Sequence, residues 1–333
     1  MANKIRVVTF GLGPVGCGIA NLAARKKDVA IVGAVDLRNV GKDLGEVANI
    51  GRRTGVRISD DAAGVLKRTK PDVVLHATAS SFPAVYPQLE MIVKAGACVV
   101  STCEELSYPF LKNPKLAAAL DKLAKKHGVA VMSTGVNPGF LMDTWPLAMT
   151  AVCQDVKKIR SVRIQDASPR RLPFQKKIGA GRSLAEFKKL VKSGEIRHVG
   201  LPESIAMIAA GLGWKLDKIT ESIGPIVAAK PVRSRFLAVK AGQAAGVKQI
   251  GRGFSRGKEV ITLEFQAYLG AEESYDAVCI KGVPAMEVVI KGGTHGDIAT
   301  ASMVVNAIPR ILKVSPGLVT MKDIPMVSAI PNR

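Results

Sequence analysis

Cysteine and histidine are scarce in this chain, and neither is spaced as a metal site or a disulfide framework would require. The 333 residues contain five cysteines, and no two of them form a C-x-x-C pair. An odd and scattered set of cysteines favours a reducing compartment over a disulfide-stapled secreted fold. The four histidines, at positions 76, 127, 198 and 295, lack ligand spacing, so we expect no metal site.

Long apolar runs, repeats and low-complexity linkers are also missing. No run approaches the roughly 18 apolar residues that a membrane-spanning helix needs. The first residues, MANKIRVV, lack the basic-then-apolar order of a signal peptide. We therefore expect a cytoplasmic protein that does not use a membrane as a partner.

Acidic residues are few: 27 Asp and Glu stand against 48 Lys and Arg, and the net charge is +21. A strongly basic chain raises nucleic acid as a partner. Here, however, the basic residues occur as scattered pairs, such as Lys26-Lys27 and Arg170-Arg171, without a long basic run or an aromatic-studded motif. We expect a solvated basic surface that attracts an anionic cofactor, and no nucleic-acid partner.

A glycine motif stands near the start of the chain. The β-branched apolar run Ile5–Phe10 predicts a buried strand, and it leads directly into the order G-x-G-x-x-G. In such a loop Gly11 permits a tight turn, Gly13 lets the backbone approach a pyrophosphate, and Gly16 lets the next helix pack closely on the sheet. The motif therefore predicts a dinucleotide site.

The residues after the motif indicate which dinucleotide it is. The amino end of the next helix, at Pro14 and Val15, offers N–H donors and a positive dipole end to the phosphates. A second apolar run, Val29–Val35, ends in Asp36, 20 residues past the last glycine of the motif. An acid there favours NAD, because it meets the ribose hydroxyls. Arg38 lies close enough to meet a 2′-phosphate, so the expected cofactor is NAD or NADP.

The order of expected elements predicts an α/β chain with two domains, in keeping with a prior of roughly 100–200 residues each. Strands and helices alternate up to residue 139, which is typical of a doubly wound parallel Rossmann sheet. Sequential strands joined by short loops run from Arg233 to Lys291, which predicts a mainly antiparallel sheet. We expect a Rossmann domain at 1–139, an α+β domain at 140–296, and a closing helix at 297–312 that packs back on the first domain.

Three local predictions rest on weaker patterns. We expect a helix over residues 140–153, a loop over 167–181, and a helix that begins at Tyr86. We also expect His76 to be packed within its strand rather than to be catalytic.

Small and polar residues follow several of the expected strands. Ligands of open α/β sheets bind at the carboxyl ends of the strands, so we expect these residues to border the cofactor. The expected cofactor-binding residues are Gly11, Gly13, Pro14, Val15, Gly16, Asp36, Arg38, Ala77, Thr78, Ala79 and Thr102.

Two adjacent acids, Glu104 and Glu105, are the candidate catalytic residues. Successive residues of an extended segment point to opposite sides, so only one of them is expected to face the cofactor. A carboxylate beside a nicotinamide would stabilise a cationic iminium and accept a proton from ammonia or an amine. A surface acid pair at a helix amino end fits the position equally well.

The expected substrate pocket combines a polar group with an apolar wall. The Asn137 amide follows another strand end, where it orients a substrate group or simply forms an Asn-Pro turn. For the remaining candidates, core packing or a surface position is the alternative to a pocket role. They are Phe140, Met142, Phe174, His198, His295 and Thr300.

Together these motifs resemble a known family. The segments GLGPVGCGIA, VSTCEELSYP, STGVNPGFLMD, DASPRRLPFQKKIGAG and GGTHGDIATA are similar to those of the 2,4-diaminopentanoate dehydrogenase-like family, which includes native amine dehydrogenases and is related to the dihydrodipicolinate reductase fold. The resemblance implies a homodimer formed through the second sheet and NAD(P)H-dependent reductive amination of a carbonyl with ammonia, or the reverse deamination. It implies that one of Glu104 and Glu105 is catalytic, of which we favour Glu104, and that Asn137 and Phe140 line the pocket.

Some alternatives remain open. Dihydrodipicolinate reductases carry paired histidines, which this chain lacks, so that activity is not expected. An apolar wall without a clear carboxylate clamp favours a small aldehyde, ketone or amine over a diamino acid. An ammonia-independent semialdehyde or hydroxy acid reductase, with Cys103 as nucleophile, is a second enzyme hypothesis. A redox-sensing or nucleic-acid-associated Rossmann protein would bind the cofactor without turnover.

Overall fold

The structure is a computed structural model that describes residues 4–332. The first three residues of the segment that lacks signal-peptide features therefore lie outside it. The chain divides into two compact units. Residues up to Phe140, together with those from His295 onward, form the first unit, and Leu141–Thr294 form the second.

The first unit is built on a parallel sheet of seven strands in the order β15-β6-β5-β4-β1-β2-β3. This arrangement confirms the predicted doubly wound Rossmann fold. The two-residue strand β15 was not expected, and it pairs in parallel with β6 at the edge of the sheet. The strands are β1 (Ile5–Phe10), β2 (Val29–Val35), β3 (Ile58–Ser59), β4 (Val73–His76), β5 (Cys98–Ser101), β6 (Ala130–Ser133) and β15 (Gly317–Leu318).

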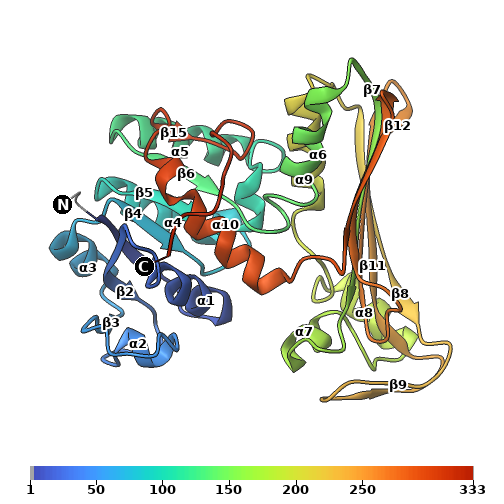
Figure 1. Cartoon of the computed structure of the whole chain (residues 1–333), viewed down its shortest axis with the longest axis horizontal. Coiled ribbons are helices and arrows are strands. Elements are labelled where there is room, and N and C mark those ends of the chain that lie inside the picture. Colours follow the sequence, from blue (N-terminus) through green and yellow to red (C-terminus); the bar gives the residue numbers. More distant parts are fainter. Residues whose placement is uncertain (1–3, 333) are drawn as a thin grey trace. The chain divides into compact units, whose positions relative to one another are not determined.

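Helices cover this sheet. Helix α10, the last of the chain, lies beside α1 against the sheet (Figure 1). Helices α3, α4 and α5 contact β2, β5 and β6, respectively. The helices of the unit are α1 (Pro14–Ala23), α2 (Leu44–Val47), α3 (Ala62–Thr69), α4 (Phe82–Lys94), α5 (Pro114–Lys126), α10 (Gly296–Ile311) and the 3₁₀ helix η1 (Glu104–Ser107).

Helix α4 begins at Phe82, four residues before the expected start. Pro83 lies in the first turn of the helix, where the missing N–H of proline costs nothing. The carboxylate of Glu105 accepts a hydrogen bond from the backbone N–H of Phe82 at 2.9 Å. A side chain from a different strand end therefore completes the amino end of this helix.

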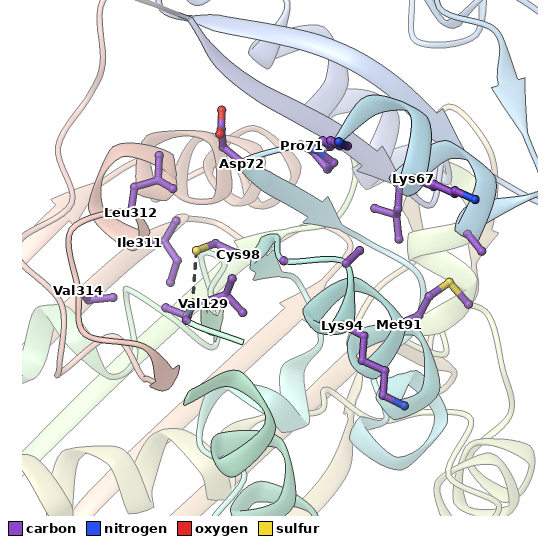
Figure 2. A pocket seen from close by; sticks show the side chains of 17 residues that line it. Lys67, Pro71, Asp72, Met91, Lys94, Cys98, Val129, Ile311, Leu312 and Val314 are labelled. Carbon is purple, nitrogen blue, oxygen red and sulfur yellow. Dashed lines mark hydrogen bonds between the residues drawn. The ribbon is translucent and has the colours of Figure 1, made fainter. Parts of the chain in front are cut away.

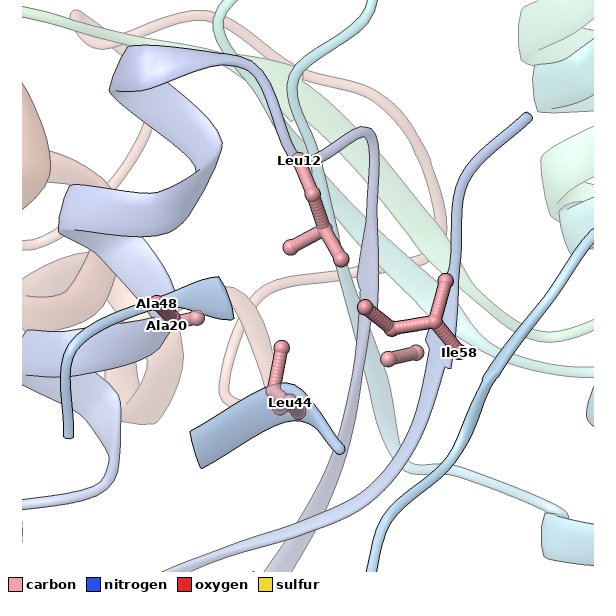
Figure 3. Close-up of a cluster of buried hydrophobic side chains, with 6 residues drawn as sticks. Leu12, Ala20, Leu44, Ala48 and Ile58 are labelled. Atoms are coloured by element: carbon pink, nitrogen blue, oxygen red, sulfur yellow. The ribbon is translucent and has the colours of Figure 1, made fainter. Parts of the chain in front are cut away.

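A cluster of buried apolar side chains packs against the glycine loop. Leu12, inside the loop, points toward Leu44 of α2 and Ile58 of β3 (Figure 3). Ala20 of α1 and Ala48 belong to the same cluster. Because Leu12 is buried between two glycines of the motif, the apolar cluster holds the loop against the sheet.

The second unit contains a sheet of six strands in the order β14-β13-β7-β12-β11-β8. Most neighbours are antiparallel, as predicted, but β7 and β12 pair in parallel. Strand β8 was not expected. The strands are β7 (Asp155–Asp166), β8 (Lys218–Val227), β11 (Ala244–Ser255), β12 (Lys258–Tyr268), β13 (Tyr275–Val283) and β14 (Met286–Lys291), and β9 (Val232–Arg233) pairs with β10 (Ala238–Val239) separately.

Two local predictions for this unit were wrong. The helix expected over 140–153 is only α6 (Thr144–Met149), followed by the 3₁₀ helix η2 (Thr150–Val152). It begins late because Asp143 caps it, and the Asp143 carboxylate also accepts a hydrogen bond from Ser204 at 2.7 Å. The loop expected over 167–181 contains α7 (Leu172–Lys177). The remaining helices are α8 (Leu184–Lys192) and α9 (Leu201–Gly211).

Within residues 4–332, no helix combines the length and the apolar character that crossing a bilayer requires.

Candidate active site

The glycine loop between β1 and α1 has the close contacts that the motif predicts. Gly11 has φ +91°, and a Cβ on it would lie 2.5 Å from the carbonyl oxygen of Ala77. A Cβ on Gly16 would lie 1.9 Å from the carbonyl oxygen of Gly11. A Cβ on Gly13 would meet no atom within 4 Å among the described residues. Gly11 and Gly16 therefore allow close packing within the protein, whereas Gly13 leaves open space beside the loop.

Asp36, at the end of β2, holds the same loop. One carboxylate oxygen accepts a hydrogen bond from the backbone N–H of Leu12, and the other accepts one from the backbone N–H of Arg38, both at 2.6 Å. The Arg38 side chain is exposed. The acid expected to meet the ribose thus joins the glycine loop to the segment after β2.

A cavity of about 290 Å³ lies at the carboxyl ends of the parallel strands. The glycine loop, the segments that follow β4, β5 and β6, and one residue of α10 contribute to it. This position matches the rule for ligands of open α/β sheets. The lining residues are Gly13, Pro14, Val15, Gly16, Ala77, Thr78, Ala79, Ser80, Thr102, Glu104, Ser133, Thr134, Gly135, Asn137, Pro138 and Thr300.

The two adjacent acids lie in different environments. Glu104 begins η1 and lines the cavity. Glu105 does not line it; its carboxylate binds the Phe82 N–H, and its own N–H donates to the carbonyl of Ser80 at 3.2 Å. The structure therefore separates a cavity-lining acid from a helix-capping acid, a choice that their positions in the sequence left open.

Three further polar residues line the cavity: Thr300, Asn137 and Thr134. Thr300 of α10 accepts a hydrogen bond on its hydroxyl from the backbone N–H of Val136 at 3.3 Å, which connects α10 to the segment after β6. Asn137, from that same segment, lines the cavity and is 9% exposed. The buried hydroxyl of Thr134 also lines it and has no hydrogen-bond partner among residues 4–332.

Several residues expected at the site do not line this cavity. Gly11, Asp36 and Arg38 support or flank the glycine loop, as described above. Phe140 is only partly buried, and His295 caps α10, accepting a hydrogen bond from the Ile298 N–H at 3.4 Å.

Three other expected pocket residues belong to the second unit. Met142 has no accessible surface, which is typical of a core side chain. Phe174 lies under the guanidinium of Arg170, 4.2 Å from its ring centroid. His198 packs against Phe265, with 4.6 Å between the ring centroids. Desolvation and the nearby cations lower the pKa of His198 to about 3, so this ring is neutral at physiological pH. Pocket roles for these three residues stay predictions.

Sequence reasoning missed Ser133, Thr134, Gly135 and Pro138. Each stands at the end of β6 or in the segment that follows it. The rule that already selected Ala77 and Asn137 would have found them, had it been applied to every residue at a strand end.

The Cys103 thiol does not suit nucleophilic catalysis. It is fully buried, and its Sγ lies 3.2 Å from the carbonyl oxygen of Ser80, to which it donates. Burial, and secondarily the charges of Glu104 and Glu105, raise the pKa of Cys103 to about 12. The thiolate that a nucleophile requires is therefore not populated near neutral pH.

A larger cavity, of about 790 Å³, lies at the amino ends of the same parallel strands (Figure 2). It is bounded by the end of α3, the start of β4 and the end of α10, and Cys98 is one of its lining residues. The Cys98 sulfur accepts a hydrogen bond from the Ala130 N–H at 3.4 Å. Its lining residues, among those that the structure describes, include none from the Gly11–Gly16 loop. We therefore do not assign this cavity to the cofactor, although its volume is larger.

The residues at the smaller cavity fit a dinucleotide. The open space at Gly13 lies at the amino end of α1, where the first N–H groups of a helix have no intrahelical partner and bind phosphate oxygens. The orphaned Thr134 hydroxyl offers a hydrogen bond deeper in the cavity. Gly13, Val15 and Gly16 would hold the diphosphate, and Asp36 and Arg38 would meet the ribose.

Comparisons with known proteins agree with this site and fold. Residues 5–134 match the family described as "Dihydrodipicolinate reductase, N-terminus", and residues 140–333 match "2,4-diaminopentanoate dehydrogenase C-terminal domain". The chain is 37% identical over 338 residues to 2,4-diaminopentanoate dehydrogenase of Acetoanaerobium sticklandii, covering 98% of this chain and 95% of the relative.

Amine dehydrogenases are also similar to the chain. The protein from Streptomyces virginiae is 26% identical over 358 residues, covering 98% of both chains. The solved amine dehydrogenase from Mycobacterium smegmatis is 26% identical, with a TM-score of 0.85 over 98% of both chains. The resemblance inferred from the motifs is therefore confirmed, and the chain belongs to the 2,4-diaminopentanoate dehydrogenase family.

Proposed function

We propose that this chain is an NAD(P)-dependent dehydrogenase that interconverts a primary amine with a carbonyl compound and ammonia. The observation that carries the proposal is an acid in the cavity wall: among residues 4–332, Glu104 is the one acidic residue that lines the cavity. Glu104 lines a cavity that also includes the phosphate-binding loop, whereas Glu105 is engaged in capping α4. The family membership supports the same class of reaction.

The protein's contribution to the reaction is proton transfer and charge stabilisation. The cofactor supplies or accepts the hydride. Glu104 accepts a proton from nitrogen when ammonia adds to the carbonyl and returns it to the hydroxyl group that leaves as water. The carboxylate that is restored in this way then stabilises the cationic imine. Asn137 orients a polar group of the substrate, and Thr134 and Thr300 supply hydroxyls to the same wall. Fixed positions of these groups lower the entropic cost of bringing the reactants together.

Two substrate classes are candidates. The expected apolar wall favours a small aldehyde or ketone and the corresponding amine. The higher identity to 2,4-diaminopentanoate dehydrogenase than to the amine dehydrogenases favours a diamino acid as the second candidate.

Ammonium dependence tests the reaction class. With NADH or NADPH and a panel of small carbonyls, we expect cofactor oxidation that requires ammonium. In the reverse direction, we expect reduction of NAD⁺ or NADP⁺ by simple amines or by 2,4-diaminopentanoate. Turnover of a semialdehyde or hydroxy acid without ammonium would contradict the proposal, and cofactor binding without any turnover would support a binding protein instead.

The open face of the six-stranded sheet supports a homodimer. The other face is covered by α9, because a Cβ on Gly251 would lie 2.8 Å from Ile205. On the open face Glu264 is nearly buried between Arg160 at 2.7 Å and Lys248 at 2.8 Å. Burial alone would raise the pKa of Glu264, but these hydrogen bonds lower it to about 2. Paired charges and partly exposed apolar side chains suit packing against a second copy of the sheet.

Light scattering after gel filtration measures this association. We expect a molar mass about twice the chain mass of 35.2 kDa. Val289 of β14 is 45% exposed on the open face, and Val289→Glu should yield the monomer by burying a charge. Val152→Glu is the matched control, since Val152 is 69% exposed in η2. A monomeric wild type would refute the dimer.

A further inference from the structure

His76 at the end of β4 is a buried titratable group to which the proposed reaction gives no role. It has no solvent exposure, and its ring packs 5.5 Å from that of Phe10. Nδ1 lies 2.9 Å from the Ser101 hydroxyl, and Nε2 lies 2.8 Å from Oε1 of Gln88. The hydroxyl of Thr78, a cavity-lining residue, lies 3.0 Å from the same Nε2. A single hydrogen bond thus connects the His76 ring to a residue that lines the cavity.

The hydrogen-bond partners of the His76 ring determine which of its two nitrogens carries the proton. An amide oxygen only accepts, so Nε2 must carry the hydrogen that faces Gln88. In a neutral ring Nδ1 then accepts, and the Ser101 hydroxyl donates to it. Burial lowers the pKa of His76 to about 4, with the Gln88 hydrogen bond opposing this shift.

Ser101 connects the ring to the turn that carries Glu104. Its hydroxyl accepts a hydrogen bond from the backbone N–H of Cys103 at 3.0 Å while it donates to His76. The Ser133 hydroxyl contacts the carbonyl oxygens of Ser101 and Cys103 at 3.0 and 2.6 Å. Glu104 follows immediately as the first residue of η1. The backbone before Glu104 is therefore tied to the buried ring.

We propose that His76 is a positioning residue, a neutral ring protonated on Nε2 that orients the Thr78 loop through Gln88 and the Glu104 turn through Ser101. The ring does not line the cavity itself. It acts there through Thr78, whose hydroxyl lies 3.0 Å from Nε2 and donates a hydrogen bond to Oε1 of Gln88 at 2.8 Å. Both loops line one cavity, so a single buried ring sets their relative placement. The kinetic part of this inference rests on the proposed function, but the protonation state of the ring does not.

Imidazole ¹⁵N NMR tests the protonation state without any turnover. The chain has only four histidines, so each ring can be assigned from a single His→Gln variant. We expect His76 to show the neutral Nε2–H pattern unchanged from pH 6 to 9, because its pKa lies near 4. An Nδ1–H pattern, or a midpoint close to the usual value of about 6.5, would overturn the assignment.

Ser101→Ala tests the positioning role. It removes the bridge but keeps the ring, and we expect kcat to fall roughly 10- to 100-fold with little change in the affinity for cofactor. Thr9→Val is the matched control, because it deletes an equally buried hydroxyl of β1 that has no hydrogen-bond partner among the described residues. We expect this variant to retain the wild-type kcat.

A double variant separates positioning from general destabilisation. If Ser101 acts through Glu104, Ser101→Ala combined with Glu104→Gln is no slower than Glu104→Gln alone. Multiplicative losses, or a Ser101→Ala enzyme as fast as wild type, would overturn the positioning role. Absence of ammonium-dependent turnover in the wild type would instead contradict the proposed function, and the NMR result would still decide the state of His76.

Discussion

Glu104→Gln is expected to lower kcat for ammonium-dependent turnover about 100- to 1,000-fold, the loss typical of removing one preorganised charge-stabilising group. Glutamine has nearly the same shape but neither accepts the proton nor stabilises the cationic imine. The affinity for NAD(P)H, measured by fluorescence titration, should remain that of the wild type, because Glu104 belongs to η1 rather than to the phosphate-binding loop.

Glu105→Gln is the matched control for this variant, since it makes the same chemical change one residue away. Its amide oxygen still accepts from the Phe82 N–H, so we expect kcat close to wild type and a loss of stability of at most about 1 kcal/mol. Full activity of Glu104→Gln, or equal losses for the two variants, would show that the reaction does not use the cavity acid as proposed.

Gly16→Ala should have the second large effect, a loss of cofactor binding accompanied by lower thermal stability. The new Cβ would sit 1.9 Å from the carbonyl oxygen of Gly11, a backbone atom that cannot move without displacing the loop from the sheet. Thermal unfolding without cofactor should show a lower Tm than the wild type. Titration with NADH should show no saturable binding.

Substitutions at two nearby glycines distinguish a packing defect from a loss of space for the diphosphate. Gly13→Ala places a Cβ in open space, so we expect an unchanged Tm without cofactor but weaker cofactor binding, because the methyl group occupies the space for the diphosphate. Gly18→Ala is the control inside α1, where the nearest atom that the Cβ would meet in the described part of the chain is the Cβ of Ala301 at 3.9 Å. It should bind cofactor normally and be as stable as the wild type or more so. Wild-type affinity in Gly13→Ala would refute the placement of the diphosphate.

Local sequence signals predicted those parts of the fold in which neighbouring residues carry the information. The β-branched run at Ile5–Phe10 and the glycine spacing suffice to define the strand, the loop and α1, because close backbone contacts require glycine at Gly11 and Gly16 and Gly13 leaves open space. The alternation of strands and helices likewise predicted the parallel sheet. Elements shaped by distant partners were missed: β15 depends on pairing with β6, and the start of α4 depends on Glu105.

The sequence by itself determined that a dinucleotide loop begins the chain and that an acid pair follows a neighbouring strand. It did not distinguish Glu104 from Glu105, because adjacent residues differ in direction rather than in composition. The tertiary structure gives them different surroundings: the Glu105 carboxylate accepts a hydrogen bond from the Phe82 N–H, and Glu104 lines the cavity. It also brought His76, Ser101 and Gln88 together from three elements. Contacts of this kind form only when the sheet assembles, since no local pattern encodes hydrogen bonds between residues that are distant in the chain.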